Sequence, residues 1–122
     1  MFTRATIIVL CCFASPAFAQ SDWVGNYASR HGPYSLSAKI SPNAGGTFKV
    51  KVEVASQRPS CMGEVETTAE MKGSELVTQP AEKGDECRLT ISKSGTGITL
   101  KEDKCSTWHG AACEFSGSLK RR

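Results

Sequence analysis

The sequence predicts an all-β domain: a small antiparallel meander closed into a roughly eight-stranded barrel and linked by two disulfides. Three observations predict this fold. Apolar and polar residues alternate with period two in short runs. Turn-forming residues separate the runs at short intervals. No long helical period, internal linker or low-complexity tract interrupts them. Evenly spaced strands with one apolar face are typical of a barrel, whose closure hides the sheet edges.

The clearest strand is 48–54, in which Phe48, Val50, Val52 and Val54 point to one face and charged residues to the other. Glycine, proline and asparagine divide the rest of the chain into similar runs. In order, the strands are expected at 23–29, 34–40, 48–54, 61–69, 75–79, 87–92, 98–100 and 113–119. The first and last runs carry related glycine patterns at 25–27 and 117–119, and we expect these strands to pair and close the barrel.

Residues 1–19 have the three parts of a secretory signal peptide. Arg4 supplies the positive charge, a short apolar run follows, and Ala17-Phe18-Ala19 matches the small-x-small cleavage pattern. The apolar run is shorter than the roughly 20 residues of a membrane span, so no transmembrane anchor is expected. Cleavage near Ala19 leaves residues 20–122 as a single disulfide-linked β domain, periplasmic or secreted.

The six cysteines divide between these two segments. Two of them lie in the signal peptide, whereas Cys61, Cys87, Cys105 and Cys113 remain in the exported domain. Four cysteines allow three pairings. We expect Cys61–Cys87 and Cys105–Cys113, because each pair joins sequence neighbours and neither requires strands to cross.

Charge is unevenly distributed along the chain, whose formal net charge is +3. Residues 64–86 are acidic, and residues 87–122 are basic and end in Lys120-Arg121-Arg122. A nucleic-acid-binding protein needs a basic stripe interleaved with aromatic residues, so no nucleic-acid partner is expected from this short tail. The acidic stretch is either a solvated face or a surface that steers a basic protein partner.

The segment 104–113 holds the densest group of chemically useful side chains, Lys104, Ser106, Trp108 and His109 among them. A disulfide across it would give a constrained loop that displays Trp108 and His109 to a partner. The alternative is that the indole folds inward to cover the barrel and leaves His109 solvated. Cys105-x3-His109-x3-Cys113 also allows a metal interpretation, but thiols pair in an oxidising compartment. A Ser106–His109 nucleophile lacks an orienting carboxylate. We therefore expect no catalytic residues, metal or cofactor.

The C-terminal pattern resembles that of small exported lysozyme inhibitors of Gram-negative bacteria. It reads Cys-x-x-aromatic-x-Gly-x-x-x-x-Phe-x-Gly, carried by Cys105, Trp108, Gly110, Phe115 and Gly117. The resemblance implies a small β-barrel whose loops enter the lysozyme cleft and set serine and lysine side chains against its catalytic carboxylates. The candidate side chains are those of Ser92 with Lys93, or Lys104 with Ser106.

This resemblance gives the leading functional hypothesis, a periplasmic protein that binds a peptidoglycan-cleaving muramidase through a constrained loop. The muramidase is either a host lysozyme or the bacterium's own enzyme. An inhibitor of a secreted protease on a similar barrel is one alternative. A carrier of a small ligand, or an envelope accessory protein that uses the barrel interior, is another.

Overall fold

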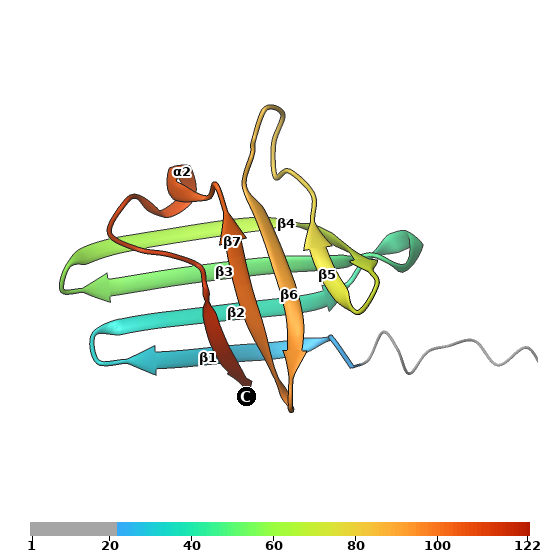
Figure 1. Ribbon diagram of the computed structural model, residues 1–122, viewed down its shortest axis with the longest axis horizontal. Helices are drawn as coiled ribbons and strands as arrows, with labels where there is room; N and C mark the ends of the chain where they lie inside the picture. Colours follow the sequence, from blue (N-terminus) through green and yellow to red (C-terminus); the bar gives the residue numbers. More distant parts are fainter. Residues whose placement is uncertain (1–21) are drawn as a thin grey trace, which may run out of the picture.

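A computed structural model of the chain describes residues 22–122, and the expected signal peptide and its cleavage site lie outside them. The described part is almost entirely strand (Figure 1). The elements are β1 (Gly25–His31), β2 (Tyr34–Pro42), the 3₁₀ turn η1 (Ala44–Gly46), β3 (Phe48–Gln57), β4 (Ser60–Lys72), β5 (Glu75–Thr78), β6 (Arg88–Ser94), β7 (Gly97–Asp103), the short helix α2 (Ser106–His109) and β8 (Gly117–Arg121).

The eight strands form a closed antiparallel barrel in which each pairs with its neighbours in sequence. In Figure 1, β6, β7 and β8 cross steeply in front of β1 to β4, so that the barrel is flattened into two crossing layers. As expected, β1 and β8 close it, through the pairs Tyr27↔Arg121 and Ala28↔Lys120. The predicted eight-stranded meander is confirmed.

The barrel interior is packed with apolar side chains. Phe48, Val50, Val52 and Val54 all point inward and are 2% exposed or less, as their alternation predicts. The largest fully buried side chains are those of Tyr27, Phe48, Phe115, Leu36, Ile40, Leu76, Leu89, Ile91, Ile98, Leu100, Val50 and Val52.

The last strand differs from the expectation, because β8 begins at Gly117 and not at residue 113. Phe115 is buried, but its N–H donates to the side chain of Glu102 instead of to a neighbouring strand. The Glu102 N–H in turn donates to the hydroxyl of Ser116. At this point side-chain hydrogen bonds take the place of backbone hydrogen bonds between strands. Residues 110–116 form an irregular connection between α2 and β8.

The expected disulfide pairing is wrong. Cys61 is bonded to Cys113, with Cα atoms 5.9 Å apart, and Cys87 is bonded to Cys105, with Cα atoms 4.4 Å apart. Each bond therefore joins a cysteine outside the segment 104–113 to one within it. The segment is held at both ends by the barrel and is not closed into a ring of its own.

Strand register explains the correction. In the β6–β7 hairpin Arg88 faces Asp103, so that Cys87 lies beside the first residues after β7 and within reach of Cys105. By contrast, β4 pairs with β5 only from Ala69 onward, and Cys61 lies at the other end of β4. Cys61 instead faces Ser56 of β3 and lies on no strand paired with β6, so the nearest-neighbour assumption fails.

Candidate functional site

The segment after β7 and the loop before β6 form one exposed surface, which we call the α2 face. It comprises Lys104, Ser106, Thr107 and Trp108, together with loop residues 82–86. A hollow of about 680 Å³ lies between the two parts. Of the residues predicted as a binding site, Lys104, Ser106 and Trp108 come together here.

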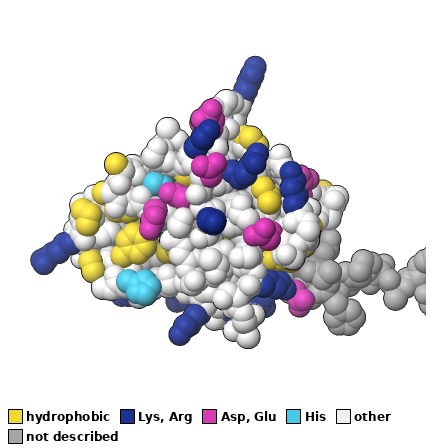
Figure 2. Space-filling view, viewed as in Figure 1, with side chains coloured by type: hydrophobic (Ala, Val, Ile, Leu, Met, Phe, Trp, Pro, Cys, Tyr) yellow, Lys and Arg dark blue, Asp and Glu magenta, His cyan; other side chains and the backbone are white. Residues whose placement is uncertain are grey.

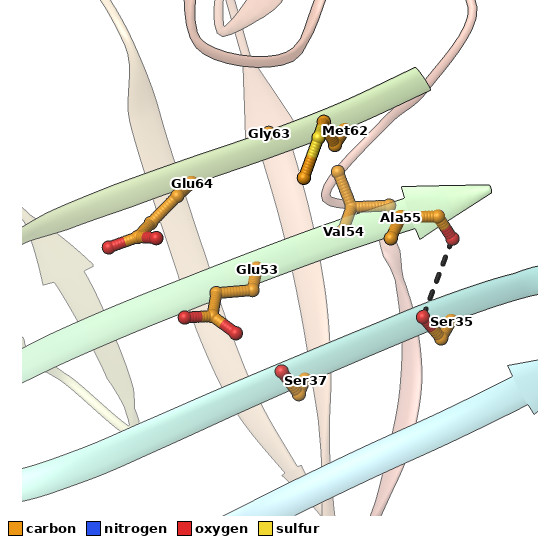
Figure 3. Close-up of a pocket in the computed structure, with 8 residues that line it drawn as sticks. All are labelled: Ser35, Ser37, Glu53, Val54, Ala55, Met62, Gly63 and Glu64. Carbon is orange, nitrogen blue, oxygen red and sulfur yellow. Dashed lines mark hydrogen bonds between the residues drawn. The ribbon is translucent and has the colours of Figure 1, made fainter. Parts of the chain in front are cut away.

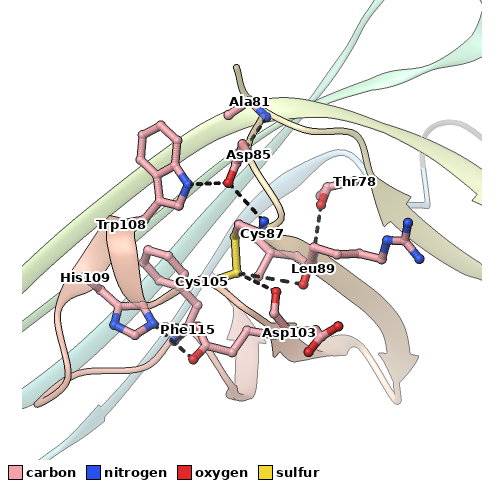
Figure 4. Close-up of a disulfide and its surroundings, with 12 residues drawn as sticks. Thr78, Ala81, Asp85, Cys87, Leu89, Asp103, Cys105, Trp108, His109 and Phe115 are labelled. Atoms are coloured by element: carbon pink, nitrogen blue, oxygen red, sulfur yellow. Dashed lines mark hydrogen bonds and ion pairs between the residues drawn. A yellow bond between two sulfur atoms is a disulfide. The ribbon is translucent and has the colours of Figure 1, made fainter. Parts of the chain in front are cut away.

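The two disulfides fix the α2 face from either side. The Cys87–Cys105 bond attaches the residue just before α2 to the start of β6, and the Cys61–Cys113 bond attaches the chain beyond α2 to β4. Figure 4 shows the first of these bonds between the labelled Cys87 and Cys105, to one side of Trp108. Because both ends are anchored, the segment loses little conformational entropy when it meets a partner.

Asp85 joins the two halves of the α2 face. Its carboxylate accepts hydrogen bonds from the indole N–H of Trp108 at 3.1 Å and from the backbone N–H groups of Cys87 and Ala81 at 2.9 and 3.1 Å (Figure 4). Burial opposes the charged form, but the three donors outweigh it and lower the pKa of Asp85. Trp108 is half-buried, and its indole N–H holds it in place. Its position therefore lies between the two considered from the sequence, an indole displayed on the loop and an indole folded inward over the barrel.

His109 is the last residue of α2, and it is 6% exposed. It is therefore neither displayed for a partner, as predicted, nor solvated, which was the alternative considered from the sequence. Its Nε2 lies 2.7 Å from Oε2 of Glu102, and its Nδ1 contacts the carbonyl oxygen of Gly110. The ring also packs edge-on against Phe115, with centroids 4.7 Å apart. The side chain of His109 therefore packs α2 against the barrel.

A glycine allows α2 to lie directly on the barrel wall. A Cβ atom on Gly63 of β4 would come within 2.4 Å of Cβ and 2.6 Å of Cα of His109. Only a residue without a side chain admits this approach. The sequence analysis did not single out Gly63, whose only signal was a glycine within a strand run.

The predicted residues Ser92 and Lys93 do not join the α2 face. They lie near the β6–β7 turn, at the opposite end of the hairpin from Lys104. The ammonium of Lys93 is 3.4 Å from a carboxylate oxygen of Asp22 and 4.9 Å from the ring centroid of Trp23. This lysine covers one end of the barrel, so the predicted set divides between the two ends of the β6–β7 hairpin.

The acidic stretch does not form one acidic surface. In β4, Glu64 and Glu66 each lie 3.4 Å from a lysine of β3, Lys51 and Lys49 respectively. Hydrogen bonds to Glu53 and Glu64 raise the pKa of Lys51. On the face drawn in Figure 2, acidic and basic side chains are interspersed. The exposed acidic groups of the stretch are divided between the strands, at Glu64, Glu66 and Glu75, and the loop of the α2 face, at Glu82 and Glu86.

A second hollow, of about 380 Å³, lies on the outer surface of β2, β3 and β4 (Figure 3). Ser35 and Ser37 form its floor, Glu53 and Glu64 one side, and Met62 its far edge. Met62 is 79% exposed. It also borders the hollow beside α2, where it neighbours Trp108 and Gly110. Met62 therefore extends the α2 face onto the sheet, a contribution that the sequence analysis missed.

The cysteines and the histidine considered for metal binding or nucleophilic chemistry are engaged in disulfide bonds and hydrogen bonds. Cys105 and Cys113 are in disulfides, which removes both thiolates from the metal interpretation. Ser106 shares a helical turn with His109, but the imidazole nitrogens are directed to Glu102 and Gly110. Within residues 22–122, no three His, Cys, Asp or Glu side chains are placed to share a metal ion.

Comparison with known protein families, with characterised proteins and with solved structures finds no match to this chain. The helices in the described part are too short to span a membrane. The described residues thus form a disulfide-linked β-barrel that carries an exposed segment attached to it at both ends.

Proposed function

We propose that this protein is an inhibitor-like binding protein that blocks a peptidoglycan-cleaving muramidase with its α2 face. The observation that carries the proposal is the rigid display of Lys104 and Ser106 on a segment held by both disulfides and by the Asp85–Trp108 hydrogen bond. A rigid segment of this kind enters a cleft at low entropic cost.

The chemistry of a muramidase cleft suits these side chains. Glycoside hydrolases place two carboxyl groups on either side of the scissile bond. A lysine ammonium forms a charge-assisted hydrogen bond to a carboxylate, and a serine hydroxyl adds a neutral one. Lys104 is 63% exposed, and its partner Glu86 is 4.0 Å away and 74% exposed. Such a surface pair is weak, so Lys104 readily exchanges Glu86 for a carboxylate of the enzyme.

The backbone at Lys104 supports the same assignment. Its φ angle is +56°, and it is the one residue other than glycine with positive φ in the described chain. Non-glycine residues held in this region cluster at active sites and ligand-binding segments. Met62 and the exposed edge of Trp108 supply apolar contact area beside it, as methionine and tryptophan do at many interfaces.

Two disulfides fit an oxidising compartment. We therefore place the protein in the periplasm or outside the cell, after cleavage near Ala19. The filled interior gives no support to the alternative of a small-ligand carrier, since its largest side chains leave less than 2% of their surface exposed. An inhibitor of a secreted protease on the same barrel would use the same α2 face.

An inhibition assay tests the proposal. Purified residues 20–122 are titrated into a host lysozyme and into an endogenous muramidase, and lysis of cell walls is followed. We expect inhibition at micromolar concentrations or below, weakened about tenfold by Lys104→Ala, because an ion pair at an interface contributes about 1.5 kcal/mol or more. Lys93→Ala is the matched control, since Lys93 lies at the other end of the hairpin, and it should leave inhibition unchanged.

The outcomes separate the hypotheses. Absence of both inhibition and complex formation with either enzyme would refute the proposal. Inhibition that Lys93→Ala weakens and Lys104→Ala does not would move the site to the opposite end of the barrel. Parallel titration into secreted serine and cysteine proteases tests the protease alternative.

A further inference from the structure

The barrel has an open seam between its first and last strands. β1 and β8 are joined by two residue pairs, the second being Ala28↔Lys120. In the same register Arg30 would face Ser118, but β1 continues to His31 without pairing to β8. In Figure 1, β1 extends beyond the point at which β8 crosses it. A hollow of about 880 Å³ lies here, bounded also by the β6–β7 turn. We call it the basic seam.

The alternation of strand hydrogen bonding identifies the backbone groups that the seam exposes. The carbonyl oxygen of Asn26 accepts from the N–H of Arg122 across the β1–β8 junction at 2.9 Å. Backbone groups of an antiparallel strand point to the same side at every second residue. Arg30 therefore directs its N–H and C=O toward β8, and Ser118 directs its own toward β1. No backbone hydrogen bond within residues 22–122 outside the regular ladders involves either residue.

The side chains around the seam are basic. Arg30, His31, Lys120 and Arg121 line it, and no aspartate or glutamate does. Arg30 and Lys120 are exposed, and neither has an acidic partner within 4.0 Å among the described residues. Five lysines have one, and several other described cations, such as Lys39 and Lys101, have none, so it is their position beside free strand edges that distinguishes Arg30 and Lys120. The basic seam thus has free backbone groups at Arg30 and Ser118 and, beside them, cationic side chains without acidic partners.

We propose that the basic seam binds a short, extended acidic segment of another protein by strand addition. The incoming backbone pairs with Arg30 on one side and Ser118 on the other. Its carboxylates lie against the guanidinium of Arg30 and the ammonium of Lys120. Main-chain hydrogen bonds supply affinity in this mode, and side chains supply selectivity. The free strand edges favour a peptide over a sulfated glycan or an anionic membrane, neither of which has a backbone to pair.

Fluorescence anisotropy of residues 20–122 with a labelled peptide tests the seam. The probe alternates Glu and Val over about six residues, the length of a typical strand. We expect saturable binding that weakens as salt is added. Arg30→Gln with Lys120→Gln should weaken it at least about tenfold, which corresponds to about 1.4 kcal/mol. Lys101→Gln, an exposed lysine of β7 outside the seam, should change it less than twofold.

Two further probes separate the contributions. The same peptide with alternate backbone nitrogens methylated keeps its charge but cannot donate into a ladder, and it should not bind. Equal binding of the methylated peptide would overturn strand addition. Binding of a sulfated oligosaccharide or of phosphatidylglycerol vesicles, without binding of the peptide, would overturn the choice of partner. Circular dichroism of the double variant verifies that the barrel is intact, and the single changes Arg30→Gln and Lys120→Gln repeat the test if it is not. None of these residues belongs to the α2 face, so muramidase inhibition is a separate result.

Discussion

Individual residues determine how closely α2 approaches the barrel, and Gly63 is the most demanding of them. In Gly63→Ala the new methyl group would lie 2.4 Å from Cβ of His109 and 2.6 Å from the carbonyl oxygen of Trp108. The helix must move, and overpacking of this kind costs about 1–3 kcal/mol. We expect urea denaturation to show that loss of unfolding free energy, together with weaker muramidase inhibition.

Gly117→Ala is the matched control for this change. Its added methyl group would meet only Cδ2 of Leu36 at 3.1 Å, the end of a flexible side chain. We expect a smaller loss of stability and unchanged inhibition. An equal effect of the two substitutions would show that the contact between β4 and α2 has no special role.

Asp85 gives the α2 face a dependence on pH. The folded pKa of its carboxyl group lies below the ordinary value of 3.8, so its contribution to stability is present above about pH 4 and is lost as the pH falls through the lowered pKa. Asp85→Asn should cost about 1 kcal/mol at pH 7, because a charged acceptor is lost. The difference from the wild type should shrink at an acidic pH below 4, as the lowered pKa is approached. Urea denaturation at both pH values, followed by tryptophan fluorescence, measures this convergence.

At the scale of elements, β8 has the fewest residue pairs of the eight described strands, two with β1 and three with β7. Arg121 adds to the junction with β1. Its Nη2 donates to the carbonyl oxygen of Asp22 at 2.6 Å and to the hydroxyl of Tyr27 at 2.8 Å, and its guanidinium lies 5.3 Å from the Tyr27 ring centroid. We expect Arg121→Ala to lower stability by about 1–2 kcal/mol and to speed amide hydrogen exchange in β8.

Arg122→Ala is the control for this prediction. The backbone N–H of Arg122 keeps its bond to Asn26 when the side chain is removed. An exposed side chain of this kind usually changes stability by no more than about 0.5 kcal/mol. If the two variants exchange equally in β8, the side chain of Arg121 does not hold the barrel closed.

At the scale of the whole molecule, the barrel was predictable from the sequence and the attachment of the α2 segment was not. Apolar and polar residues alternate along 48–54 because one face of the strand is buried. This local pattern was enough to predict both the strand and its inward-facing residues. The packing of α2 on Gly63 joins residues more than forty positions apart and leaves no periodic trace. The Cys87–Cys105 bond does follow from the β6–β7 hairpin. If the pairing of Arg88 with Asp103 is continued by one residue, Cys87 lies opposite residue 104, next to Cys105.

The disulfides connect the barrel to the α2 face, and their removal should separate stability from function. In the loop-entropy treatment, bonds that span 18 and 52 residues contribute about 3 and 4 kcal/mol. That is a large share of the 5–15 kcal/mol typical of a domain. We expect Cys87→Ala with Cys105→Ala to lower the unfolding free energy by about 3 kcal/mol and to weaken inhibition as well, since it frees the residue that precedes α2.

Peptide mapping of the non-reduced protein tests the connectivity on which this prediction depends. Proteolysis and mass spectrometry should find Cys61 linked to Cys113 and Cys87 linked to Cys105, with no free thiol among the four. A peptide that links Cys105 to Cys113 would contradict the fold, because the α2 segment would then be closed on itself and detached from β4 and β6. Rigidity of the α2 face comes from those two attachments, so the mapping result also decides whether the proposed inhibitory surface is preorganised.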